Sequence, residues 1–205
     1  PDNTAAQQTI NEFCAAEDRF VLAPASVRPW ERYQFLRGTE NALMDLALDT
    51  ERMQSLLQKI HDFYLEELRF WARTDVDALH FGDDWGGQTG MLVSPDMWRE
   101  LFKPLYKQYV QIARDAGKFI FYRSNGYILD ILPDLIDIGI DAIKSQLTCM
   151  PLDQVAAIAK GRITFWGEID RQHTLPAQNS QAAEDEVAKI AAHLYSPHGG
   201  IIAQC

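Results

Sequence analysis

The 205-residue sequence is poor in cysteine and in positive charge. Its three cysteines, Cys14, Cys149 and Cys205, form no CxxC pair, and an odd number does not make a disulfide framework. We therefore expect a reducing, cytoplasmic compartment. Lysine and arginine number 19 against 29 aspartates and glutamates, which gives a formal net charge of −10. Because nucleic acids and anionic membranes recruit basic surfaces, we expect neither as a partner.

Long apolar runs and several common motifs are also missing. No stretch approaches 18 consecutive apolar residues, so no transmembrane helix is expected. The N-terminal PDNTAAQQ lacks the basic and apolar regions of a signal peptide, and because it begins with proline we interpret the chain as part of a longer one. No apolar run is followed by GxGxxG or a P-loop, and the histidines show no HExxH or HxH spacing. A dinucleotide fold and a histidine-rich metal site are therefore not indicated.

What is present is an alternation of short apolar runs and helical patterns, in a chain that is 47% apolar. The expected strands are residues 19–25, 77–82, 118–122, 141–147, 162–167 and 200–204. The expected helices are residues 4–17, 39–49, 50–73, 94–116, 127–138, 151–160 and 180–195, with a short one inside 26–38. Ser94 and Ser180 are the expected caps of the helices that they open.

Strands separated by helices indicate parallel pairing through right-handed crossovers. A doubly wound open sheet and a (β/α)8 TIM barrel both fit this order. A complete barrel has eight units in about 250 residues, whereas this chain offers six. Since the nucleotide motifs of the open sheet are absent, we predict an incomplete TIM barrel of about six β/α units that lacks N-terminal units. Residues 1–205 are expected to form a single domain.

The most informative stretch is His80–Gly90, which reads HFGDDWGGQTG. It places Asp83 and Asp84 where an expected strand gives way to a glycine-rich loop. Two adjacent carboxylates are costly when buried, because like charges raise each other's pKa, unless they bind something or take part in chemistry. The alternative is that one aspartate caps a turn and the other faces water.

Polar residues also follow the other expected strands. They are Arg123, Ser124 and Asn125; Lys144, Ser145 and Gln146; Glu168, Asp170, Arg171 and His173; and Gln204 and Cys205. Because the carboxyl ends of parallel strands share one face, these residues predict a pocket for a small-molecule substrate. The planar guanidinium of Arg123 suits a substrate carboxylate, or it neutralises Asp83 or Asp84.

For three of these residues, a purely structural role is the alternative to a functional one. Glu168 is an acid–base candidate, and its alternative is a salt bridge to Arg171 or Lys144. His173 lies in a polar loop, where exposure is the commoner outcome. Cys205 is either a reactive thiol or ligand, or inert packing in an apolar strand.

Several longer runs resemble one family. They are PWERYQFLRGTENALMDLAL, FGDDWGGQTGMLVSPDMWRELFKPLYKQYV, GKFIFYRSNGYILDILPDLIDIGIDAI and RITFWGEID. Over residues 20–205 the sequence resembles the uroporphyrinogen decarboxylase superfamily, which includes tetrapyrrole decarboxylases and corrinoid-linked methyltransferases. The resemblance implies a TIM barrel with its pocket at the carboxyl ends of the strands. Members of this family can be homodimers, whereas the residues themselves leave the oligomeric state open.

The two branches of the superfamily differ at the site. In the methyltransferase branch, a His-x-Cys pair and a later Cys bind a zinc ion that activates a thiol methyl acceptor. The matching residues here are Arg123, Asn125 and Cys205, so only Cys205 is retained and this zinc site is not expected. In the decarboxylase branch, a serine aligns with Asp83, and a tyrosine falls next to Tyr33.

These observations lead to three functional hypotheses. The first is a superfamily enzyme that transfers a methyl group from a small methylated compound or its corrinoid carrier, with a corrinoid protein as partner. The second is a tetrapyrrole decarboxylase, and the third is a non-catalytic ligand- or corrinoid-binding barrel. For an enzyme, the expected catalytic residues are Asp83, Asp84 and Glu168. The expected substrate-binding residues are Arg123, Asn125, Gln146, Asp170 and Tyr33.

Overall fold

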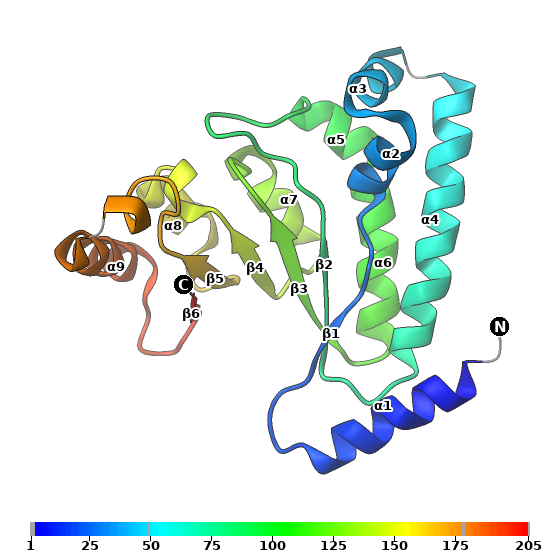
Figure 1. The fold of residues 1–205 in the computed structure, drawn as a ribbon, viewed down its shortest axis with the longest axis horizontal. Coiled ribbons are helices and arrows are strands. Elements are labelled where there is room, and N and C mark those ends of the chain that lie inside the picture. Colours follow the sequence, from blue (N-terminus) through cyan, green and yellow to red (C-terminus); the bar gives the residue numbers. More distant parts are fainter. Residues whose placement is uncertain (1–2, 49, 178, 205) are drawn as a thin grey trace. The chain divides into compact units, whose positions relative to one another are not determined.

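The structure is a computed structural model that describes residues 3–48, 50–177 and 179–204, without the side chain of Glu168. Helices and strands alternate through most of it (Figure 1). The strands are β1 (Leu22–Pro24), β2 (Ala78–Gly82), β3 (Phe119–Ser124), β4 (Ala142–Ser145), β5 (Thr164–Glu168) and β6 (Ile201–Gln204). They neighbour one another in the order β1-β2-β3-β4-β5-β6. The pairs β1–β2, β4–β5 and β5–β6 are parallel, as the alternation predicts.

The helices of the described residues follow the predicted spacing. The α-helices are α1 (Thr4–Ala16), α2 (Pro29–Arg37), α3 (Thr39–Leu48), α4 (Glu51–Ala72), α5 (Pro95–Leu101), α6 (Lys103–Asp115), α7 (Leu132–Asp137), α8 (Leu152–Ala159) and α9 (Ser180–Leu194). Short 3₁₀ turns are η1 (Leu129–Ile131), η2 (Leu147–Cys149) and η3 (Leu175–Ala177). None of the described helices is long and apolar enough to cross a membrane.

The chain divides into two compact units. Unit 1 contains the residues up to Asp83 together with Glu100–Phe121, and unit 2 contains Asp84–Arg99 together with the residues from Tyr122 onward. The core of unit 1 lies where α4 packs against α6 and α2. The buried residues of α4 are Met53, Leu57, Ile60, His61, Tyr64 and Leu68. Their i, i+3, i+4 spacing places them on one face of this 22-residue amphipathic helix, and that face packs into the core.

Unit 2 is built around the end of β3 and the strands β4–β6. Its buried strand residues include Ile143 and Phe165, which stand opposite each other in the β4–β5 ladder. On the other face of these strands, Lys144 pairs in register with Trp166, and its Nζ lies 5.0 Å from the centre of the indole ring. This less buried face therefore carries a cation on an aromatic surface.

Three local predictions are corrected. The helix expected over residues 94–116 is interrupted at Phe102, because Pro104 has no N–H to bond the carbonyl of Glu100. Strand β3 runs on to Ser124, so Arg123 lies inside a strand and not after it. The residue that caps α9 is Asn179 and not Ser180, since the Asn179 side chain accepts the N–H of Gln181 at 3.0 Å.

Candidate functional site

In unit 2, the structure brings Asp84, Arg123 and Asn125 together. The backbone N–H of Asn125 donates to Asp84 Oδ1 at 3.0 Å, and its Nδ2 donates to Asp84 Oδ2 at 3.0 Å. The Arg123 guanidinium lies 3.6 Å from the same Oδ2, and the two side chains are 39% and 30% exposed. Asp84 therefore orients an amide and a guanidinium that both remain accessible to a bound molecule.

Close backbone contact holds this cluster in place. Gly126 has a φ of +74°, and a Cβ on it would lie 2.1 Å from the Gly86 carbonyl oxygen. The Gly86 N–H donates to the Asn125 carbonyl at 3.1 Å, and the Tyr127 N–H donates to the Gly87 carbonyl at 2.8 Å. Glycines are needed here because the loop after β2 touches the backbone that follows β3.

Trp85 fixes the same loop to β3 through hydrogen bonds. Its backbone N–H donates to Ser124 Oγ at 3.1 Å, and its Nε1 donates to the Tyr122 hydroxyl at 2.9 Å. Trp85, Tyr122 and Ser124 are all fully buried. The glycines of this loop were visible in the sequence, but no sequence pattern predicted that Trp85 bonds to β3.

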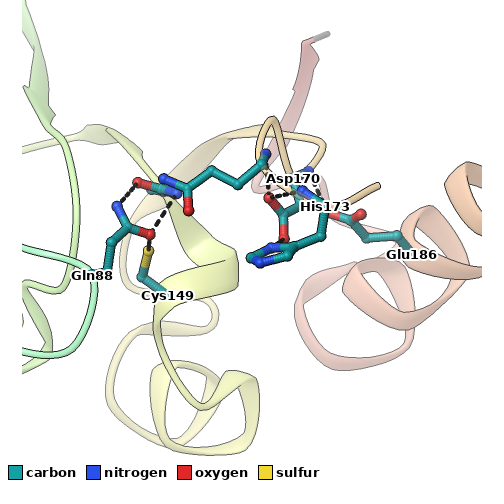
Figure 2. Close-up of polar contacts among 7 residues, drawn as sticks. Gln88, Cys149, Asp170, His173 and Glu186 are labelled. Carbon is teal, nitrogen blue, oxygen red and sulfur yellow. Dashed lines mark hydrogen bonds and ion pairs between the residues drawn. The ribbon is translucent and has the colours of Figure 1, made fainter. Parts of the chain in front are cut away.

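A second cluster in unit 2 surrounds Gln146, at the end of β4. The amides of Gln146 and Gln88 pair with each other at 3.3 and 3.4 Å, and Cys149 Sγ donates to Gln88 Oε1 at 3.3 Å (Figure 2). Burial raises the pKa of the Cys149 thiol, and the negative charge of Asp170 adds to this effect. The thiol is thus kept protonated as a donor, and not poised as a thiolate.

Asp170 follows β5 and organises the loop around it. Its Oδ1 accepts the N–H groups of Gln172 and His173 at 2.7 and 3.2 Å, and its Oδ2 lies 2.9 Å from His173 Nδ1 (Figure 2). Its own N–H donates to Glu186 Oε1 of α9 at 2.7 Å. Burial opposes ionisation of Asp170, but the hydrogen bonds that it accepts outweigh burial and lower its pKa. The side chain of His173 is 80% exposed.

Asp83 belongs to unit 1 and is 1% exposed. Its carboxylate accepts the backbone N–H groups of Trp30 and Glu31, each at 2.8 Å, and the Tyr106 hydroxyl at 2.6 Å. Burial raises its pKa to about 7, even though all three donors favour the ionised form. The first N–H groups of α2 thus find an acceptor in Asp83. Tyr106 is a partner that sequence reasoning missed, because it stands in a helical stripe that reads as core.

Tyr33 also lies in unit 1 and is 2% exposed. Its hydroxyl donates to Asp45 Oδ2 at 2.8 Å, and the same carboxylate binds the Arg37 guanidinium at 2.7 and 3.1 Å. Burial together with the Asp45 charge raises the pKa of Tyr33 to about 12.

Two predicted site residues fall outside what the structure describes. The backbone of Glu168 ends β5, but its side chain is not described, and Cys205 lies outside the described residues. Within residues 3–48, 50–177 and 179–204, no group of three His, Cys, Asp or Glu side chains could hold a metal ion. Arg123 and Asn125 are both engaged with Asp84 at the positions that zinc ligands occupy in the methyltransferase branch. A guanidinium is not a zinc ligand, so the residues present do not fit a zinc ion.

Six strands in sequential order that alternate with helices define the fold as part of a TIM barrel. The model of the family described as uroporphyrinogen decarboxylase (URO-D) matches residues 7–204. The chain therefore belongs to the uroporphyrinogen decarboxylase family.

Comparison with solved structures supports the fold. The chain is similar to a methyltransferase from Methanosarcina mazei, with a TM-score of 0.73 at 13% identity, over 99% of this chain and 60% of that one. It thus spans about three fifths of the length of that methyltransferase. It is also similar to a Xanthomonas albilineans dihydropteroate synthase with 4-aminobenzoic acid, with a TM-score of 0.50 at 13% identity, over 91% of this chain and 61% of that one. The comparison with curated proteins gives no match.

Proposed function

We propose that this chain carries the substrate-binding part of an enzyme that transfers a methyl group between a small methylated compound and a corrinoid held by a partner protein. The observation that carries the proposal is the Asp84–Arg123–Asn125 cluster. The match to the family model and the likeness to the Methanosarcina mazei methyltransferase support the same direction.

In this proposal Arg123 binds an anionic group of the substrate. Its guanidinium lies 3.6 Å from Asp84, and its side chain remains 39% exposed. A fixed, planar donor of this kind recognises a carboxylate better than a mobile ammonium does. Asn125 Nδ2 donates to Asp84, and Asn125 Oδ1 accepts a hydrogen bond from the substrate in this proposal.

The other predicted residues take supporting roles. Gln146 and Asp170 follow β4 and β5, where their hydrogen bonds fix the loops beside the site. Glu168 at the end of β5 is the proposed group that gives or takes the substrate's proton. For Asp83 and Tyr33 we propose a positioning role, since hydrogen bonds within unit 1 occupy both side chains. The corrinoid supplies the methyl acceptor or donor, and no step is assigned to zinc.

The test replaces Arg123 by alanine in the full protein. Arg123→Ala should raise the KM or the Kd for the methylated substrate at least about tenfold, the loss expected for one charge-assisted contact. The matched control is Arg162→Ala, because Arg162 also lies near one carboxylate, Asp137, at 3.6 Å, on a 53% exposed side chain. Turnover is followed by the visible spectrum of an added methylated corrinoid. An Arg123→Ala protein with unchanged KM, Kd and turnover would sink the proposal.

The alternatives are separated by two direct measurements. A tetrapyrrole decarboxylase would convert uroporphyrinogen, an activity that the family's description suggests. Loss of carboxyl groups from added uroporphyrinogen, with no change in the corrinoid spectrum, would favour it. A non-catalytic binding barrel would alter the corrinoid spectrum on binding without turning over any methylated compound.

A further inference from the structure

Strands β3 and β4 end in the same order of residue types. Residues 123–125 read Arg-Ser-Asn and residues 144–146 read Lys-Ser-Gln, and in each run the serine is the last residue of its strand. Both serines are buried, whereas the cation before each serine is only partly buried. Because successive side chains of a strand point to opposite faces, each cation lies on the face of the sheet opposite to its buried serine.

One loop contacts both strand ends within unit 2. Asp84 accepts the backbone N–H and the Nδ2 of Asn125 at 3.0 Å each, and Gln88 of the same loop pairs with the amide of Gln146 at 3.3 and 3.4 Å (Figure 2). Each of the two amides stands two positions after the cation of its strand, and β3 and β4 are neighbours in the sheet. Adjacent strands lie about 4.8 Å apart, so the two cations occupy equivalent and neighbouring positions on one face.

The positive charge of Lys144 is held in place without being neutralised. Its Nζ lies 5.0 Å from the centre of the Trp166 ring on β5, and none of the carboxylates that the structure describes forms an ion pair with it. A cation–π contact orients an ammonium group but leaves its charge intact. Arg162 of the same unit differs, because its guanidinium lies 3.6 Å from the carboxylate of Asp137. Lys144 therefore keeps a full positive charge that an anion can use.

The contacts of the two cations draw their charges apart. Arg123 lies 3.6 Å from Asp84, which bonds to the residue directly after β3, whereas Lys144 lies over Trp166 on the side of β5. One compact anion such as phosphate would have to pull both side chains away from these contacts. Two separate carboxylates on one small molecule can meet each cation where it already lies.

We propose that Arg123 and Lys144 together bind a methylated substrate that carries two carboxylate groups, one for each cation. Arg123 binds the first carboxylate through its planar fork, and Lys144 binds the second as a point charge. In a chain with a formal net charge of −10, this site concentrates positive charge where a dianion binds. The inference names the substrate class of the proposed methyl transfer and rests on that function for the methyl group, whereas the binding of two carboxylates can be measured by itself.

The first experiment measures the Kd of simple probes for the full chain by calorimetry. Malonate, succinate and glutarate are each compared with the monocarboxylate of the same chain length, which is propionate, butyrate or valerate. At least one dicarboxylate should bind about tenfold or more tightly than its monocarboxylate, the gain expected of a second charge-assisted contact. Equal Kd values in every pair, no binding of any probe, or tighter binding of inorganic phosphate than of every dicarboxylate would each overturn the proposal.

The second experiment removes the charge of Lys144. Lys144→Met should abolish the preference for the dicarboxylate and leave the Kd of the monocarboxylate within about twofold, because Arg123 still binds it. Lys144→Arg keeps a cation and should retain most of the preference, whereas Arg123→Ala should weaken the binding of both probes. Circular dichroism confirms that each variant is folded.

The matched control is Lys160→Met, because Lys160 is an exposed lysine directly after α8 of the same unit. It should leave both Kd values unchanged. A preference that survives in Lys144→Met, or one that Lys160→Met abolishes as well, would contradict the assignment of the second carboxylate to Lys144.

The substrate class and the methyl transfer fail separately. If the preference depends on Lys144 but no methylated dicarboxylate or monocarboxylate changes the spectrum of an added corrinoid, the methyl-transfer proposal is wrong and the two-carboxylate site stands. If a methylated monocarboxylate is turned over with the same kcat/KM by the wild type and by Lys144→Met, and no dicarboxylate is preferred, methyl transfer stands and the substrate class is wrong.

Discussion

Asp83 combines complete burial with three hydrogen-bond donors. Its pKa is raised to about 7, above the value of about 3.9 expected in an unfolded chain. Between about pH 4 and pH 7 the folded protein holds a proton that the unfolded chain has released. Stability contributed by this group is therefore fully present below about pH 4 and is lost as the pH rises toward 7, at about 1.4 kcal/mol per pKa unit.

Asp83→Asn tests the direction of this pH dependence of stability, because an amide cannot ionise. The free energy of unfolding of the wild type, minus that of Asp83→Asn, should fall between about pH 4 and pH 7. Taking the difference removes the titration of the other carboxylates. Urea unfolding at several pH values measures it. Two curves that stay parallel through this window would mean that Asp83 is ionised in the folded protein throughout.

Gly126 and Gly161 have nearly the same backbone conformation, with φ of +74° and +76°. They differ in what surrounds them: a Cβ on Gly126 would meet the Gly86 carbonyl at 2.1 Å, whereas nothing lies within 4 Å of one on Gly161. Gly161→Ala should lower the free energy of unfolding by about 1 kcal/mol, the cost of a left-handed residue. Gly126→Ala should lose about 3 kcal/mol or more, because the loop must also move. Thermal or urea unfolding compares the two, and equal losses would contradict the close contact.

At the scale of single elements, the stability of α4 depends on Thr50, the residue that caps its N-terminus. Thr50 Oγ1 accepts the Met53 N–H at 3.1 Å, which satisfies one of the free donors of the first turn. Thr50→Ala should lower the free energy of unfolding by about 1 kcal/mol. The control is Asn3→Ala, since Asn3 precedes α1 but its side chain makes no capping bond. Equal effects of the two substitutions would show that the cap of α4 contributes nothing.

Most helices could be predicted because their apolar spacing and caps are local. The stripe of α4 and the caps Thr50 and Ser94 needed only the neighbouring residues. The break at Phe102 between α5 and α6 could not be predicted, since the sequence shows that Pro104 has no N–H but not how the helix responds. The extension of β3 to Arg123 and Ser124 depends on pairing with other strands, which no local pattern encodes.

The same distinction holds for the site. The positions of Asp84 and Asn125 after two strands followed from the order of the elements, and both residues meet Arg123 of β3 in unit 2. The partners of Gln146 and Asp83 could not be predicted, because Gln88 and Tyr106 reach them only through tertiary packing. The catalytic roles of Asp83, Asp84 and Glu168, and the meeting of all the predicted residues in one pocket, stay predictions.

At the scale of the whole molecule, burial is uneven within each unit. In unit 1, α1 has no buried residue, whereas α4 has six. In unit 2, Leu194 is the one buried residue of α9, all of whose residues the structure describes, whereas three of the four residues of β4 are buried. Elements with little buried apolar surface open at low free-energy cost. Hydrogen exchange should therefore be faster in α1 than in α4 and faster in α9 than in β4. The reverse order in either unit would contradict this picture.

The backbone N–H groups of Trp30 and Glu31 donate to Asp83, and Glu31 and Asp83 are 52 positions apart. These hydrogen bonds therefore hold together the two ends of a long segment of the chain. The segment from α2 to β2 is thus tied at its two ends, where the Gly82 N–H also donates to the Val27 carbonyl at 3.2 Å. Length can therefore be added or removed between α3 and α4 while these bonds keep the two ends of the segment together. Such a change in length requires that a hydrogen-bond acceptor remain at position 83.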